Sequence, residues 1–166
     1  MILIELIITL ILIGLIGGFT GLFLYTGVTG FLTSKKISET ALKAQAAMDR
    51  ITIELRDIKR ETNRPILNST SITYQSDDAD NLPGTRSISY NSSNGTINLT
   101  VDGTPYVLLD QIQPNSFNLS WTERDLNNLS ADGDELAEIQ VVFKVVDVGT
   151  QFTVRVYPRN MVKRYS

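Results

Sequence analysis

Hydrophobic residues are concentrated at the start of the chain, where residues 6–34 contain no charged side chain. About 20 apolar residues are enough for a helix that spans a bilayer. The stretch is too long for the apolar core of a signal peptide, so it predicts a transmembrane helix. Glu5 stands immediately before this stretch, and a carboxylate in hydrocarbon costs about 2.5 kcal/mol or more.

The apolar stretch also contains glycines at helical spacing. The pairs Gly14/Gly18 and Gly17/Gly21 have the small-xxx-small pattern that lets membrane helices approach closely. Each glycine inside a helix costs about 0.5–1 kcal/mol relative to alanine. The glycines therefore predict a segment that packs against copies of itself and can lose helical form locally.

A buried carboxylate requires a cationic partner, and the nearest candidate for Glu5 is the amine of Met1. Within one chain both groups belong to the first helical turn. In a helical assembly, Glu5 of one subunit can instead meet Met1 of the next, which neutralises both charges and fixes the axial register. We therefore take Met1, Glu5, Gly14, Gly17, Gly18 and Gly21 as the candidate assembly residues.

Residues 35–60 continue a helical pattern with one narrow apolar stripe. The stripe consists of Ile37, Ala41, Ala44, Met48, Ile51, Leu55 and Ile58. We expect it to pack on the protein's own sheet. Most charged residues of this segment, Arg50 and Glu54 among them, lie outside the stripe. A proline disfavours helical backbone at the residue before it. The segment 62–65, which finishes with Pro65, is therefore predicted to end the helix.

After Pro65 the apolar residues alternate with polar ones, which is typical of strands. The predicted strands are 71–75, 87–91, 96–101, 106–109, 116–121, 138–147 and 151–158, with turns at 93–95, 102–103 and 148–149 and surface loops at 75–86 and 123–135. Short connections favour antiparallel pairing. The expected fold is α+β: one long helix with a protruding hydrophobic half (1–34) and an amphipathic second half (35–62), which packs on a meandering antiparallel β domain (63–166).

Composition excludes several kinds of site. The chain has neither cysteine nor histidine, so disulfides, thiolate or histidine metal sites and Ser-His-Asp triads are all excluded. Its net charge of −3 gives no electrostatic basis for bulk nucleic-acid binding. The basic residues Arg159, Lys163 and Arg164 fit a solvated terminus. We therefore expect a protein that is not an enzyme.

Two kinds of surface site are candidates. Asp132, Asp134 and Glu135 surround a glycine and could supply oxygen ligands to calcium, although their spacing is not that of an EF-hand and a solvated acidic loop is the competing interpretation. Possible glycosylation sites are Asn68, Asn91, Asn94 and Asn128. Two further sequons, at Asn98 and Asn118, fall within predicted strands. No other cofactor is expected.

The segment "LIELIITLILIGLIGG", residues 3–18, resembles the amino-terminal helix of mature type IV pilins and type II secretion pseudopilins, which carry a glutamate where Glu5 stands. The resemblance implies the pilin fold and removal of a leader by a prepilin peptidase, with Met1 as the mature, N-methylated residue. It also implies an inner-membrane assembly machinery. Leu22 departs from the proline that many major pilins have there, and the neighbouring glycines could serve the same local helix break.

The resemblance implies a structural subunit of an extracellular type IV pilus-like filament. Such a subunit resides in the cytoplasmic membrane and then joins a helical homopolymer on the cell surface. Two alternatives stay open. One is a low-copy minor pseudopilin of a type II secretion or DNA-uptake pseudopilus. The other is a single-pass, membrane-anchored extracellular binding module.

Overall fold

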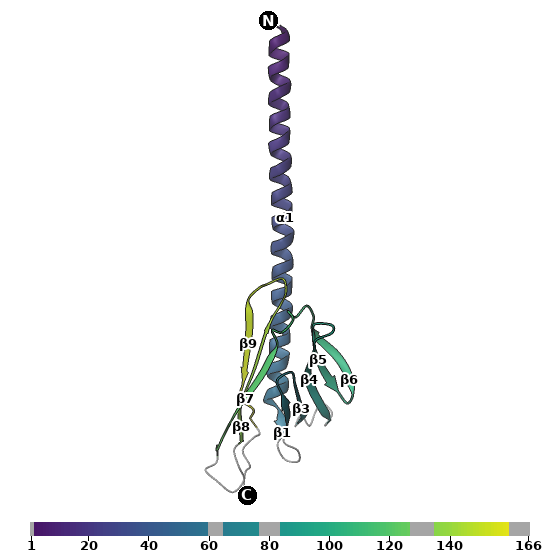
Figure 1. Ribbon diagram of the computed structural model, residues 1–166, viewed down its shortest axis with the longest axis vertical. Helices are drawn as coiled ribbons and strands as arrows, with labels where there is room; N and C mark the ends of the chain where they lie inside the picture. Colours follow the sequence, from purple (N-terminus) through teal and green to yellow (C-terminus); the bar gives the residue numbers. More distant parts are fainter. Residues whose placement is uncertain (1, 60–64, 77–83, 127–134, 160–166) are drawn as a thin grey trace. The chain divides into compact units, whose positions relative to one another are not determined.

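The computed structural model describes residues 2–59, 65–76, 84–126 and 135–159. In chain order the elements are α1 (Ile2–Arg56), β1 (Ile58–Lys59), β2 (Ile66–Asn68), β3 (Ser71–Ser76), β4 (Thr85–Asn91), β5 (Thr96–Val101), β6 (Thr104–Leu109), β7 (Asn118–Arg124), β8 (Glu135–Lys144) and β9 (Gln151–Val156) (Figure 1). The predicted α+β class is confirmed. The chain divides into two compact units, residues 1–39 and 40–166, so the boundary lies inside α1.

The first unit is a single helical segment with an apolar surface. The helix is continuous through all of its glycines. Its large apolar side chains are exposed, up to 81% for Phe23. Among the described residues, one helix is long and apolar enough to cross a membrane, judged by length and composition. An anchor in a membrane is therefore compatible with this unit, as the sequence predicted.

The strands of the second unit are all antiparallel and form two sheets rather than the single meander that the alternating pattern predicted. Among the described residues, the larger sheet has the order β1-β3-β4-β5-β6, with β2 also paired to β3, and the smaller has the order β7-β8-β9. The chain changes sheet in residues 110–117. Gln111 and Asn115 both have a φ of 59° there, and Ile112 bridges to Val145 beyond β8.

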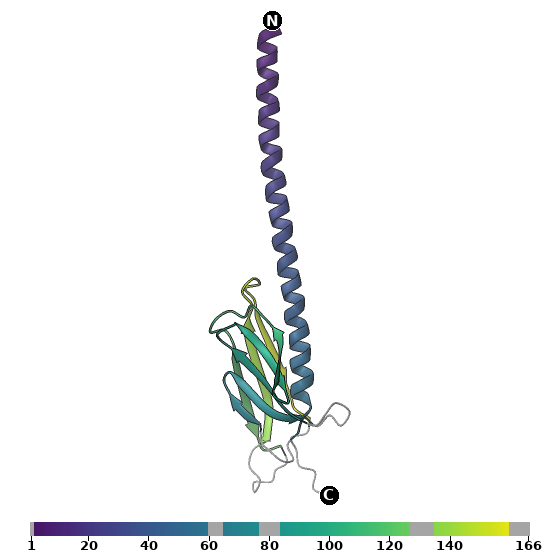
Figure 2. The same cartoon turned by 90° about the vertical axis from the view of Figure 1, so that its right-hand side faces the viewer.

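The core of this unit lies where both sheets meet the carboxyl-terminal part of α1 (Figure 2). The helix contributes Ala44, Ala47, Ile51 and Leu55, the larger sheet Ile72, Ile88 and Ile97, and the smaller sheet Ile139, Val141 and Phe143. The predicted stripe is thus confirmed from Ala44 to Leu55, whereas Ile37 is exposed. Burial of these apolar side chains, worth about 1.5–3 kcal/mol for each large one, holds the helix on the strands.

The helix ends earlier than predicted. It stops at Arg56, and Ile58–Lys59 form β1, which pairs with Gln75–Ser76 of β3. Ile58 still reaches the core, where it is fully buried, but it does so from a strand. Pairing with β3 supplies backbone hydrogen bonds that a further helical turn would otherwise have supplied. Residues 62–64 of the predicted terminus at 62–65 lie outside the described residues.

The seven predicted strands are all present: β5 has the predicted bounds, and the others have at least one shifted end. β4 begins at Thr85 and β3 ends at Ser76, so the predicted loop 75–86 is shorter than expected. β7 runs to Arg124 and β8 begins at Glu135, which likewise shortens the loop 123–135. The three predicted turns are confirmed by positive φ angles at Gly95, at Asp102 and Gly103, and at Gly149. β1 and β2 were missed because they are too short to show alternation.

Candidate functional site

Glu5 lies in the first turn of α1, where the positive end of the helix dipole favours a carboxylate. Its side chain is exposed. Met1 lies outside the described residues, so the pairing of Glu5 with an amino-terminal amine stays a prediction. Glu5 stands immediately before the uncharged segment 6–34, which is the position that this prediction requires.

The four assembly glycines share one side of the helix, because positions i, i+3, i+4 and i+7 lie on the same face. A Cβ atom at Gly14, Gly17, Gly18 or Gly21 would meet no atom within 4 Å. The face is therefore open in the single chain, and a second helix could approach it closely.

Threonine hydroxyls in the first unit donate hydrogen bonds within their own helix, a feature that was not predicted from the sequence. Each donates a hydrogen bond of 2.7–2.9 Å to the carbonyl four residues earlier: Thr9, Thr20, Thr26, Thr29 and Thr33. In an apolar environment every polar group needs such a partner. This helix can therefore be surrounded by lipid or by other apolar helices without leaving these five hydroxyls unpaired.

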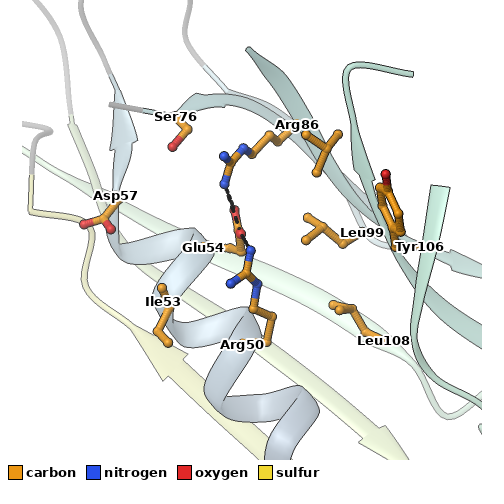
Figure 3. A pocket seen from close by; sticks show the side chains of 10 residues that line it. Arg50, Ile53, Glu54, Asp57, Ser76, Arg86, Leu99, Tyr106 and Leu108 are labelled. Carbon is orange, nitrogen blue, oxygen red and sulfur yellow. Dashed lines mark hydrogen bonds and ion pairs between the residues drawn. The ribbon is translucent and has the colours of Figure 1, made fainter. Parts of the chain in front are cut away.

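The second unit contains a polar cluster centred on the buried Glu54, and Figure 3 shows Arg50 and Arg86 on either side of its carboxylate. Glu54 is 3% exposed, which corrects the prediction that it lies off the packed face. Nη1 of Arg86 donates to both carboxylate oxygens, at 3.0 and 2.8 Å, and the Tyr74 hydroxyl donates to Oε2 at 3.0 Å. Arg50, one helical turn before Glu54, forms an ion pair with Oε1.

This cluster connects three elements. Arg50 and Glu54 belong to α1, Tyr74 to β3 and Arg86 to β4. Burial raises the pKa of the Tyr74 hydroxyl well above its ordinary value, and the neighbouring Glu54 charge and hydrogen bond raise it further. Tyr74 therefore stays protonated and able to donate at physiological pH. The arrangement fixes the carboxyl-terminal part of α1 to the larger sheet.

A cavity of about 550 Å³ lies beside the cluster. Its apolar lining comes from Leu99, Val101 and Leu108 of the larger sheet and from Ile53 of α1, and Tyr106 stands at one side (Figure 3). Its charged residues include those of the Glu54 cluster, whose groups bind one another. The described polar groups of the cavity thus mainly hold the fold together.

The predicted surface sites have mixed outcomes. Glu135 is buried at the start of β8, and its Oε2 accepts a hydrogen bond of 2.8 Å from the Leu126 amide. Asp132 and Asp134 lie outside the described residues, so the calcium site is not tested. In the described part of the chain, no group of three or more acidic residues is placed to hold a metal ion.

The asparagines of the possible glycosylation sites differ in solvent exposure. Asn68 and Asn94 are exposed and Asn91 is part-exposed, with its Oδ1 accepting a hydrogen bond from the Ser93 amide at 3.0 Å. Asn128 lies outside the described residues. Asn98 and Asn118 are in β5 and β7, as predicted.

Comparison of the chain with models of protein families, with curated proteins and with solved structures found no match. The long apolar amino-terminal helix and the antiparallel strands packed on its continuation are consistent with a pilin-like fold.

Proposed function

We propose that this chain is a structural subunit of an extracellular filament of the type IV pilus kind. The observation that carries the proposal is the division of one continuous helix between two surroundings. Residues 3–39 are exposed, and much of their surface is apolar, whereas residues 40–56 supply part of a folded core. Exposed apolar surface of this extent must be covered by lipid or by other protein surfaces.

In the proposed assembly, residues 6–34 first lie in the cytoplasmic membrane. The apolar helices of other copies then replace the lipid around them, and the globular part stays outside the membrane. The open glycine face allows close approach of neighbouring helices, and the internally bonded threonines add no desolvation cost. Glu5 pairs with the Met1 amine of the next subunit and sets the axial step.

Substitution of Glu5 tests the proposal. In cells that make the full chain, Glu5→Ala is expected to leave the subunit folded and in the membrane fraction but to abolish filaments at the cell surface. Glu39→Ala is the matched control, because Glu39 lies on the same helix in an exposed pair with Lys35. It is expected to leave filament number unchanged.

The outcomes separate the proposal from its alternatives. Normal filaments from the Glu5→Ala variant would contradict the register role. A wild-type chain that is only a trace component of the fibres would favour the low-copy pseudopilin. A wild-type chain that stays in the membrane while fibres form without it would favour an anchored binding module.

A further inference from the structure

The charged residues Glu5 and Lys35 stand at opposite ends of the uncharged segment 6–34. Both belong to α1, which is continuous between them, and the rise of the helix from one to the other is about 45 Å. The hydrocarbon core of a bilayer is about 30 Å thick, whereas the bilayer with both headgroup layers measures about 40–45 Å. A tilt of about 20°, the average for membrane helices, shortens the span only to about 42 Å. The segment therefore matches the whole bilayer, and each charge falls in a headgroup layer.

Lys36 follows Lys35, so two cations are adjacent at this end of the segment. Both are exposed. Glu39 pairs with Lys35, with Nζ 3.8 Å from Oε1 and both side chains 62% exposed. An exposed pair of this kind contributes little to stability, so an anion in the surroundings can displace the Glu39 carboxylate.

Membrane topology does not explain the position of these lysines. Basic residues beside membrane helices are enriched on the cytoplasmic side. In the proposed function, the globular part lies on the opposite side, and Lys35 and Lys36 are on that side too. Their charge opposes the proposed orientation, and attraction to anions at the outer surface would offset this effect.

Lipid phosphates are the anions that a bilayer presents at this depth. Attraction to an anionic membrane surface gains roughly fivefold in binding for each lysine close to it. The lysine ammonium group is carried on a flexible apolar stem, which lets it reach a headgroup while the stem stays against apolar surroundings.

We propose that Lys35 and Lys36 bind the phosphate groups of anionic lipids at the outer surface of the cytoplasmic membrane and so fix the depth of α1 before assembly. This inference rests on the membrane stage of the proposed function.

The lipid preference of the full chain in vesicles tests the inference. The vesicles contain phosphatidylglycerol and phosphatidylcholine in equal amounts, and a spin-labelled form of each lipid reports its contact with the protein. We expect a preference for phosphatidylglycerol of roughly two- to fivefold at low salt, which weakens at high salt. The variant Lys35→Gln/Lys36→Gln should lose the preference. Glu39→Gln should increase it, because the competing carboxylate is removed.

Lys43→Gln is the matched control, because Lys43 is also exposed but follows Lys36 by two helical turns. It is expected to keep the wild-type preference. An equal loss in Lys43→Gln, or no loss in the double variant, would overturn the inference. Potassium phosphate should weaken the preference no more than potassium chloride of the same ionic strength. A stronger effect of phosphate would assign the lysines to free phosphate instead.

Depth in the bilayer provides the second test. The chain has no cysteine, so a single introduced thiol can carry a nitroxide label. Labels at Leu22→Cys and Leu42→Cys are the references, expected in hydrocarbon and in water. The label at Ser34→Cys is expected between them, in the headgroup layer, and should change depth when Lys35 and Lys36 are both replaced by glutamine.

The depth outcomes separate the inference from the proposed function. A Ser34→Cys label as accessible to water as the one at Leu42→Cys, or one whose depth is the same with and without the lysines, would contradict the inference alone. A Leu22→Cys label that lies in water would contradict the membrane stage of the proposed function as well.

Discussion

At the scale of single residues, three side chains from three elements converge on the Glu54 carboxylate. Two of its hydrogen-bonding groups are distant in sequence, Tyr74 by 20 residues and Arg86 by 32. Glu54 and Arg86 are both buried. A buried charge whose partner is removed is strongly destabilising, whereas an exposed pair contributes little.

Replacement of Glu54 should therefore lower stability sharply. Glu54→Gln keeps the size of the side chain but removes the charge that Arg86 and Arg50 contact, and we expect a loss of about 3 kcal/mol in the free energy of unfolding. The measurement is denaturant unfolding of the detergent-solubilised chain, followed by fluorescence of Trp121, the single tryptophan.

Glu39→Gln is the control for this prediction. Glu39 pairs with Lys35 at 3.8 Å, and both side chains are 62% exposed, so the expected loss is under about 1 kcal/mol. A similar loss for both variants would contradict the role assigned to the buried cluster.

Tyr74 gives a prediction about alkaline pH. Its pKa is raised in the folded chain, whereas in the unfolded chain it is about 10. Above pH 10 the unfolded state releases this proton and the folded state keeps it, so stability falls by about 1.4 kcal/mol per pH unit. Tyr74→Phe should make stability less dependent on pH between 10 and 11, as measured by the same unfolding assay. An unchanged slope would contradict the assignment.

At the scale of elements, the two parts of α1 differ in how far their apolar side chains are buried. Its side chains Ala44, Ala47, Ile51 and Leu55 pack in a core, whereas the large apolar side chains described before Glu39 are exposed. The periodic stripe made the packed part predictable from sequence, because spacings of three and four residues define one helical face. The end of α1 at Arg56 was not predictable. It depends on β1, a strand of two residues that forms by pairing with β3 later in the chain.

Neighbouring positions on α1 should respond very differently to truncation. Ile51 is fully buried and Ile53 is 56% exposed. We expect Ile51→Ala to cost about 2–5 kcal/mol, because it leaves a cavity in the core, and Ile53→Ala to cost less than about 1 kcal/mol. Chemical denaturation of the two variants measures the difference. Equal effects would mean that this helical face is not packed as described.

The division into two sheets shows a second limit of sequence patterns. Alternation identified each long strand, since a half-buried strand repeats every two residues. It carried no signal for the change of sheet, which depends on the backbone of residues 110–117 and on left-handed conformations at Gln111 and Asn115. Glu54 was likewise missed because no local spacing links it to Tyr74 and Arg86.

At the scale of the whole molecule, the two units have different requirements. The unit 40–166 buries its own core from both sheets and α1, whereas the described residues of the unit 1–39 contribute no side chain to a core and expose their large apolar side chains. The first unit therefore needs surroundings that the single chain does not provide. Lipid before assembly and neighbouring helices afterwards meet this need in the proposed filament.

The most direct test of the central claim is the composition of fibres sheared from the native cell surface, determined by electron microscopy and intact-protein mass spectrometry. The proposal predicts that this chain is the bulk subunit of the fibres and that its mass reports any amino-terminal processing. Fibres that lack the chain, while it stays in the membrane fraction, would contradict the proposal.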